Sequence, residues 1–423
     1  FRNYDSLSLE LDDKTNILYG KNAQGKTNVL EAIYLCSTTK SHRSSKDAEL
    51  IKFENNEGHI KLFINKKGRE YRIDIHLRKN KSKGIAINGI PIKKASELFG
   101  IFNVIFFSPE DLDIIKNGPA ERRRFVDMEL CQLDKIYVYN LTNYNRIIAQ
   151  RNKLLKDIYF KPELKQTLDV WDGQLAQYGS KIIERRTNFI EKINEIIKPI
   201  HKQLTGGLED INIVYNKNCE AEDLLRRLEE NRDRDIKYKS TSIGPHKDDL
   251  LFFNDNKNIR IYGSQGQQRT IALSLKLAEL ELVKNLINDT PVLLLDDVLS
   301  ELDSERQNHL LNSIDDIQTI ITCTGLDEFI ENRFKINKVF QVTEGKVEEK
   351  NVELNFTLPN YSSKVSGKVD LNKLDLIKIY VSSFIMLIVK ALIVLVIVAY
   401  CIRLVNLRRK RMRRRKRNNK KRK

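Results

Sequence analysis

Apolar and polar positions alternate along the N-terminal quarter of the chain with a period of two, which predicts β-strands. Leucines alternate with polar residues over 7–11, and apolar residues alternate in a similar way over 60–64 and 71–75. Lys-Lys-Gly at 66–68 and Asn-Gly at 88–89 are typical of hairpin turns. This part of the chain therefore predicts strands connected by hairpins.

The apolar period becomes helical from roughly 120 to 235, where apolar residues recur three and four positions apart and glycines are few. The clearest set is Ile182, Ile183, Phe189, Ile190, Ile193, Ile196 and Ile197. From 240 to 350 strands and helices alternate again, with apolar runs at Val292–Leu295 and Ile317–Ile321. The pattern predicts an α/β nucleotide lobe split by a helical insertion. No long heptad run is present, which argues against a coiled-coil arm.

We divide the chain into five segments on this basis. They are the N-terminal half of the α/β lobe (1–115), a helical insertion lobe (116–238), the C-terminal half of the α/β lobe (239–351), a linker (352–376) and a hydrophobic, polybasic tail (377–423).

The charge distribution changes what the composition implies about partners. The formal net charge is +17, but 14 Lys or Arg and no acid lie between Arg403 and Lys423, which leaves +3 for the first 402 residues. A DNA-binding surface on the body must therefore be a local patch. The five cysteines form no C-x-x-C pair, which argues against a zinc site of that type or a disulfide framework and fits a reducing cytosol.

The apolar part of the tail could form a membrane helix and is considered separately. Residues 379–402 are almost wholly apolar, and their large side chains at about −0.3 to −0.6 kcal/mol each outweigh Lys390 at about +3 kcal/mol. A membrane helix is thus energetically feasible. The positive-inside rule, however, would keep the basic end in the cytosol and send the rest of the chain outside. We therefore favour a non-native extension over a functional anchor, with interfacial membrane contact as the alternative.

A phosphate-binding loop is the strongest chemical signal. Residues 20–27 match G-x-x-x-x-G-K-[ST], follow the predicted strand Thr15–Tyr19 and open the predicted helix Asn28–Leu35. Lys26 would reach the β- and γ-phosphates of ATP, and the Thr27 hydroxyl would bind Mg²⁺. The predicted nucleotide-binding residues are Gly20, Lys21, Asn22, Ala23, Gln24, Gly25, Lys26 and Thr27.

An apolar strand that ends in two carboxylates supplies the acidic partner. Val292–Leu295 runs directly into Asp296 and Asp297, and a buried parallel strand delivers its last side chains to the ligand edge of the sheet. Asp296 is predicted to hold Mg²⁺ with Thr27, and Asp297 to act as the catalytic carboxylate that orients or deprotonates water. A solvated acidic turn is the alternative.

A third motif points to one class of ATPase. Ser264, Gln265, Gly266 and Gln267 precede the predicted helix Thr270–Leu286 and resemble the Ser-Gly-Gly-Gln signature of the ABC class. In that class the signature contacts ATP held by the partner subunit, and the resemblance implies the same here. Ser300 and Asp303 match the D-loop of that class. A plain helix cap at Ser264, and an ordinary helix start with Ser300 as N-cap, are the alternatives.

Further motifs narrow the resemblance to the RecF family of DNA-repair ATPases. Residues 242–250 (SIGPHKDDL), 107–112 (FSPEDL), 118–127 (GPAERRRFVD) and 262–269 (YGSQGQQR) are similar to that family's signatures, in order, within a match over about 1–350. Lys247 stands where the family usually has arginine. Whether Arg122–Arg124 bind DNA phosphates or form an ion-paired face stays open, and His246 is more readily explained as a structural hydrogen-bonding residue.

The resemblance implies an ABC-type P-loop ATPase head with an inserted helical lobe. It further implies ATP and Mg²⁺ as cofactors, an ATP-dependent homodimer, and binding to gapped or single-strand/double-strand DNA. Partners would include recombination mediator proteins and recombinase, with roles in replication restart and the SOS response, in the cytoplasm at the nucleoid. The class's switch histidine is absent, because the strand after the D-loop ends in Thr322 and Cys323. This departure, with Asp297 in place of a longer glutamate, predicts slow turnover. The competing classes are an ABC transporter subunit and a short-armed SMC-like structural protein.

Overall fold

The computed structural model describes residues 1–44, 46–314, 316–326 and 335–350. A six-stranded sheet in the order β13-β12-β1-β11-β10-β6 forms its centre. The parallel strands are β1 (Thr15–Tyr19), β6 (Val104–Phe107), β10 (Val292–Asp296), β11 (Thr319–Cys323) and β12 (Lys338–Thr343), and β13 (Lys346–Lys350) adds an antiparallel edge. Strands from both ends of the chain alternate in this sheet, so its ligand edge is assembled from residues far apart in sequence.

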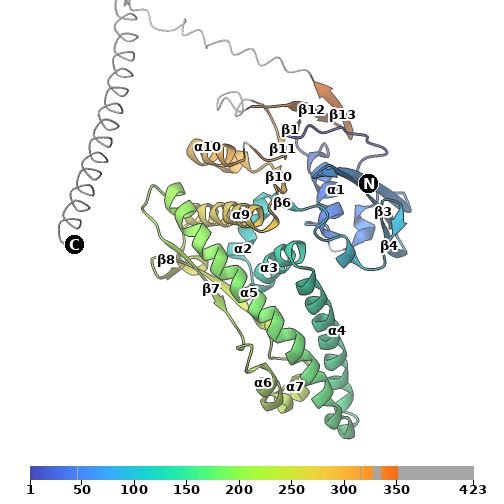
Figure 1. Cartoon of the computed structure of the whole chain (residues 1–423), viewed down its shortest axis with the longest axis vertical. Helices are drawn as coiled ribbons and strands as arrows, with labels where there is room; N and C mark the ends of the chain where they lie inside the picture. Colours follow the sequence, from blue (N-terminus) through green and yellow to red (C-terminus); the bar gives the residue numbers. More distant parts are fainter. Residues whose placement is uncertain (45, 315, 327–334, 351–423) are drawn as a thin grey trace, which may run out of the picture. The chain divides into compact units, whose positions relative to one another are not determined.

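The central strands are apolar along their length because both faces of the sheet are covered. Leu18, Leu294 and Ile320 pack on one face beneath α1 (Lys26–Thr38). Their immediate neighbours along the strands pack on the other face against α9 (Gln265–Ile287) and α10 (Ser304–Ser313). The predicted α/β architecture with inserted helices is confirmed (Figure 1).

A second, antiparallel sheet covers α1. It contains β2 (Glu57–Lys66), β3 (Arg69–Arg78), β4 (Lys81–Ile87) and β5 (Ile90–Pro91). Both predicted hairpin turns are confirmed, since Lys67 and Gly68 have φ of 52° and 74°, and Asn88 and Gly89 have φ of 53° and 81°. The predicted strand at 7–11 is wrong: this segment pairs with no strand in the described ranges. Leu9 and Leu11 pack against the core from an irregular segment. Burial of alternate leucines in such a segment gives the same period of two as a strand.

The inserted region is built around two long helices, α4 (Lys135–Ile158) and α5 (Leu168–Leu204), which pack lengthwise (Figure 1). The shorter helices are α2 (Leu112–Lys116), α3 (Pro119–Leu133), α6 (Leu224–Glu230), α7 (Arg232–Tyr238) and α8 (Ile259–Tyr262). Single 3₁₀ turns are η1 (Asp47–Leu50), η2 (Ala95–Glu97), η3 (Pro109–Asp111), η4 (Pro162–Thr167), η5 (Pro245–Lys247) and η6 (Leu299–Glu301).

The insertion is not wholly helical, which differs from the sequence prediction. β7 (Ile211–Asn216) pairs with β8 (Asp249–Asn254) in a small sheet that β9 (Lys257–Asn258) completes. Ile211 and Ile213 are buried while their neighbours are more exposed, a period of two that is too short to stand out beside long helices. β7 therefore ties the insertion directly to the segment that leads into α9.

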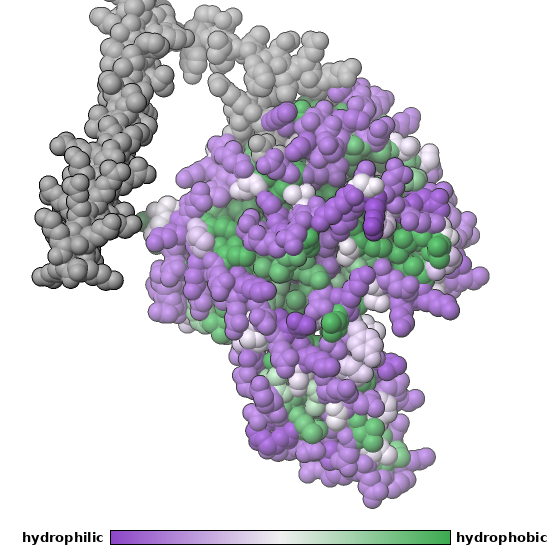
Figure 2. All heavy atoms as spheres, in the orientation of Figure 1, coloured by the Kyte–Doolittle hydropathy of each residue, from purple (hydrophilic) through white to green (hydrophobic). Residues whose placement is uncertain are grey.

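The surface of the described part is mostly hydrophilic on the face that Figure 2 shows, with apolar patches between hydrophilic side chains. No helix within the described ranges is long and apolar enough to cross a membrane. The linker and the apolar tail discussed above lie outside those ranges.

Candidate nucleotide-binding site

The loop from β1 to α1 adopts a shape that requires glycine at two positions. Gly20 has φ of 155°, and a Cβ atom there would lie 2.3 Å from the Val342 carbonyl oxygen. Gly25 has φ of 112°, and its Cβ would lie 2.5 Å from Asn3 Nδ2. At Gly20 the backbone of Val342 leaves no room for a side chain, and at Gly25 the positive φ itself favours glycine.

Neighbouring segments hold the loop from outside. The Gln24 carbonyl oxygen accepts hydrogen bonds from Asn3 Nδ2 at 3.0 Å and from Gly345 N at 3.2 Å. The Gln24 side chain accepts another from Glu344 N at 2.5 Å. The loop is thus pre-shaped by the β12–β13 turn and the N-terminal segment.

The lysine and the helix start form a place for an anion. Lys26 is 4% exposed, and its Nζ donates to the carbonyls of Gly20 at 2.7 Å and Lys21 at 3.1 Å, so the ammonium lies over the loop. No side chain caps the N-terminus of α1, and its first turn carries no acid. Uncapped N–H groups, the helix dipole and a lysine together favour phosphate oxygens.

Two hydroxyls, one from the first turn of α1 and one from β11, converge on Asp296 at the end of β10. Its Oδ1 accepts from Thr27 Oγ1 at 2.8 Å and from Thr322 Oγ1 at 2.7 Å. Burial raises the pKa of Asp296, and these two hydrogen bonds oppose the rise. The predicted Mg²⁺ ligands Thr27 and Asp296, 269 positions apart in sequence, are therefore in direct contact.

Asp297 lies beside Asp296 in an unusual backbone conformation. Its φ is 50°, a left-handed value that costs a non-glycine residue about 1–3 kcal/mol. Hydrogen bonds from its N–H to Thr322 Oγ1 at 3.0 Å and from Ser300 Oγ to its carbonyl at 2.8 Å hold that conformation. Asp297 is only partly buried, so it remains accessible to solvent.

Glu110 is a candidate site residue for which the sequence motifs predicted no role. It is exposed in η3, directly after β6. Burial is the main cause of the raised pKa of Asp296, and the charges of Asp297 and Glu110 add to it. β6 and β10 are parallel neighbours, so their carboxyl ends reach the same edge of the sheet. The sequence alone did not show that these two strands are adjacent.

The predicted signature lies on an exposed helix start. Ser264 is the N-cap of α9: its Oγ accepts from Gln267 N at 3.2 Å, and Gln267 Oε1 accepts from Ser264 N at 3.0 Å. Gln265 and Gly266 are exposed, and Gln267 Nε2 donates to Glu209 at 3.1 Å. No hydrogen bond or ion pair within the described ranges joins these residues to the phosphate loop.

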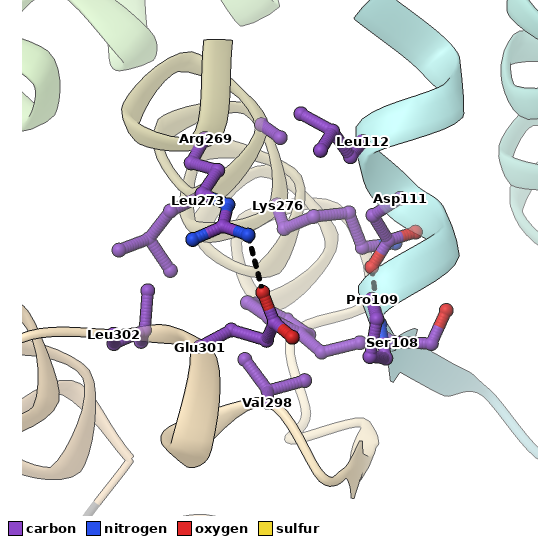
Figure 3. Close-up of a pocket in the computed structure, with 12 residues that line it drawn as sticks. Ser108, Pro109, Asp111, Leu112, Arg269, Leu273, Lys276, Val298, Glu301 and Leu302 are labelled. Carbon is purple, nitrogen blue, oxygen red and sulfur yellow. Dashed lines mark hydrogen bonds and ion pairs between the residues drawn. The ribbon is translucent and has the colours of Figure 1, made fainter. Parts of the chain in front are cut away.

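The predicted D-loop contacts both the end of the acidic strand and the helix α9, which begins at the predicted signature. Ser300 lies in η6 rather than at a helix N-cap, and α10 begins later because the Asp303 carboxylate accepts from Arg306 N at 3.0 Å. Figure 3 shows Arg269 of α9 reaching Glu301 of η6, where the ion pair is 2.9 Å long. A cavity of about 60 Å³ lies between α9, η6 and the segment after β6.

Three residues of the motifs shared with the RecF family make hydrogen bonds within the protein. They are Arg122, Arg123 and His246. Arg122 is 1% exposed and pairs with Asp249 at 2.6 Å. Arg123 donates to the carbonyl of Asp248 at 2.7 Å. His246 contacts Tyr144 Oη at 2.8 Å through Nδ1. These contacts support the ion-paired interpretation for Arg122 and the structural interpretation for His246. Arg124 is exposed and donates to the carbonyls of Ser41 and His42 at 3.2 Å, so a role in DNA binding stays open for it.

The fold and this arrangement define an ATPase head of the SMC and ABC type, and sequence comparison agrees. The model of the RecF/RecN/SMC N terminal domain family matches residues 1–348. The chain belongs to this family, and within it to the RecF family. It is 64% identical to the DNA replication and repair protein RecF of Lachnospira eligens over 353 residues, 83% of this chain and 97% of that protein.

Two further relatives support the same placement. The protein of that name from Agathobacter rectalis is 61% identical, over 82% of this chain and 96% of its own length. A solved structure of the recombination mediator protein RecF with ATP, in the RecFOR pathway, superposes with a TM-score of 0.76 at 36% identity, covering 83% of this chain and 95% of that one. The resemblance inferred from the motifs is thereby confirmed.

Proposed function

We propose that this chain is an ATP-dependent DNA-binding protein of recombinational repair and replication restart. Its relatives are named as DNA replication and repair proteins, and the solved relative is a recombination mediator with ATP. The proposal includes a cytoplasmic location at the nucleoid, gapped or single-strand/double-strand DNA as ligand, and work with mediator proteins, a recombinase and the SOS response.

One observation supports ATP binding above the others. Thr27 at the start of α1 and Asp296 at the end of β10 meet at 2.8 Å, directly beside the uncapped helix N-terminus and the Lys26 ammonium. A hydroxyl and a carboxylate are oxygen ligands of the kind that Mg²⁺ prefers. These residues therefore fit ATP with Mg²⁺: the loop would hold the phosphates, and Thr27 and Asp296 the ion, which would neutralise phosphate charge.

The same geometry supports a slow ATPase. Asp297 is positioned by its backbone hydrogen bonds beside Asp296 and is open to solvent, so its carboxylate can orient an attacking water. Thr322 occupies the end of β11, where the class has its switch histidine, and donates to Asp296 instead. A hydroxyl cannot exchange a proton as an imidazole does near neutral pH. We expect a switch with low turnover rather than a motor.

The exposed signature supports an ATP-induced homodimer. Ser264 and Gly266 offer the N-terminus of a 23-residue helix to solvent. A second copy related by a two-fold axis would place its signature on the ATP of the first, giving two composite sites.

The test uses Ser264→Arg with Ser82→Arg, at an exposed serine of β4, as the matched control. Ser264→Arg should bind ATP normally but form no ATP-induced dimer, measured by light scattering after size exclusion, and should lose ATP-dependent binding to gapped DNA. Ser82→Arg should dimerise like the unmodified chain.

A mixing experiment makes this test sharper. A mixed dimer of Ser264→Arg and Lys26→Ala has one site with both defects and one with neither, so hydrolysis should exceed that of either variant alone. A Ser264→Arg protein that dimerises with ATP, binds DNA and hydrolyses normally would remove the basis for composite sites.

A further inference from the structure

Two histidines and a glutamate gather on the outer face of the second sheet, away from the segments that form the nucleotide site. His59 of β2 and His76 of β3 are direct cross-strand neighbours, and Glu57 is two residues before His59, on the same face. The two imidazole rings stack, with centroids 4.1 Å apart and planes 20° apart. His76 Nε2 is 2.9 Å from Glu57 Oε2.

The ligand atoms of this cluster are close to a coordination geometry. One nitrogen from each histidine and one oxygen from Glu57 all lie within 4.8 Å of one another. Ligands of a tetrahedral zinc ion, each about 2.0–2.2 Å from the metal, are roughly 3.3–3.6 Å apart. Rotation of the side chains, of which Glu57 and His59 are exposed, would bring the ligand atoms to that separation, and the strand register already pairs the two histidines.

The surroundings leave room for an ion with an open coordination position. A cavity of about 200 Å³ is lined by His59, His76 and Asp74, together with Gly84 of β4. Gly84 is the cross-strand partner of His76 on its other side, and a Cβ atom there would lie 3.8 Å from the His76 Cβ. The absence of a side chain at 84 keeps the space beside the imidazole ring open.

The ligand types select the class of metal. Imidazole nitrogens suit zinc, nickel and copper ions, whereas Mg²⁺ and Ca²⁺ prefer an all-oxygen set. We propose that Glu57, His59 and His76 form a binding site for a divalent transition-metal ion of the zinc type, with the remaining position taken by water.

The bound ion would fasten an edge strand to its sheet. β2 is the edge strand, and the inward residues of β3, Ile73, Ile75 and Leu77, pack in the core that includes α1. A metal bridge from β2 to β3 therefore stabilises the sheet that covers the phosphate-loop helix. The site does not depend on the proposed ATP or DNA functions.

The test is a Zn²⁺ titration of the full chain from which metals have first been removed by chelation. Calorimetry monitors the titration, in excess Mg²⁺ and without nucleotide. We expect one more equivalent of Zn²⁺ to bind the unmodified chain than a His59→Gln/His76→Gln variant. Loss of an outer-shell partner alone weakens metal sites by about 10–100-fold, so each single variant should bind at least about tenfold more weakly. Added Zn²⁺ should raise the melting temperature of the unmodified chain but not that of the double variant.

Asn65→Ala is the control, because Asn65 is an exposed outward residue of β2 that is not one of the three ligands and does not line the cavity. It should keep the Zn²⁺ equivalent and the thermal shift. Equal stoichiometry and affinity for Zn²⁺ in the unmodified chain and the double variant would overturn the proposal. Both readouts are independent of ATP hydrolysis, so they do not test the nucleotide site.

Discussion

The nucleotide site and the inserted region use charged residues in opposite ways. At the sheet edge, the side chains of Asp297 and Ser264 are partly or fully open to solvent, although nearby hydrogen bonds fix their backbone. In the insertion, Arg122 and Arg151 are at most 1% exposed and form ion pairs with buried or half-buried carboxylates. Both regions contain residues through which the chain resembles its family.

This contrast separates residues that meet a ligand from residues that hold the scaffold. Breaking a buried ion pair leaves an unpaired charge and costs about 3–5 kcal/mol, so changes in the insertion should act on folding stability. Replacing an accessible side chain such as Asp297 costs the fold little. Lys26 is buried, but its ammonium donates to backbone carbonyls, so its removal leaves no opposite charge unpaired. Changes at the sheet edge should therefore act on ATP and DNA. The predictions below test this division.

The largest functional effect is expected for Lys26→Ala. The ammonium would make charge-assisted contacts to two phosphate groups at roughly 1.5–3 kcal/mol each, so ATP affinity should fall about a hundredfold or more. ATP-dependent DNA binding should fail, while the melting temperature without ATP should change little. Fluorescence anisotropy with gapped DNA and thermal unfolding measure the two effects.

Lys40→Ala, at an exposed lysine just after α1, is the charge-matched control and should behave like the unmodified chain. ATP-dependent DNA binding that survives in Lys26→Ala would show that the loop is not the phosphate site. A large loss of stability in Lys26→Ala would instead contradict the division between residues that bind a ligand and residues that stabilise the fold.

The contact between the insertion and the segment that follows it should respond to pH through His246, which lies 2.8 Å from Tyr144 of α4. Burial lowers the pKa of His246 to about 4, whereas an unfolded histidine titrates near ~6.5. As pH falls the unfolded chain takes up the proton first, so this contribution to stability is complete above about 6.5 and is lost toward pH 4. At pH 5 the loss is on the order of 2 kcal/mol.

Denaturant unfolding at several pH values measures this loss, and His246→Gln should give a shallower decrease between pH 6.5 and 5. Some slope should remain, because burial also lowers the pKa of His42 to about 4. An unchanged slope in His246→Gln would mean that the imidazole is not kept neutral by burial.

The sequence predicted the sheet edge better than the insertion, for a physical reason. The phosphate loop and the strand before Asp296 are local: glycine spacing and an apolar run specify them without knowledge of distant contacts. Arg122 and Asp249 are 127 positions apart, and no local pattern reveals that they pair. The role of Glu110 was missed for the same reason, since it depends on which strand neighbours β10.

Asp297→Asn should produce a smaller change, confined to chemistry. The amide keeps the size and hydrogen bonding of the side chain but lacks the charge that orients or activates water, so hydrolysis should fall by at least about tenfold. ATP binding should persist and the DNA complex should live longer. Single-turnover hydrolysis and DNA dissociation rates measure this. If hydrolysis is unchanged, the catalytic carboxylate lies elsewhere, and Glu110 is the next residue to replace.

The smallest effect is expected from removal of residues 352–423, which tests whether the described part alone carries the function. This segment holds 14 Lys or Arg between Arg403 and Lys423, enough to bind DNA phosphates without specificity at low salt. Such binding weakens steeply as salt rises, because each neutralised phosphate releases counterions.

Truncation should therefore remove ATP-independent DNA binding in low salt. It should leave ATP-dependent binding and hydrolysis unchanged at physiological salt, since Lys26, Asp297 and Ser264 are retained. If the truncated protein no longer binds DNA with ATP at matched salt, the DNA contact belongs to the removed segment, and the sheet edge would serve only as its ATP-driven switch.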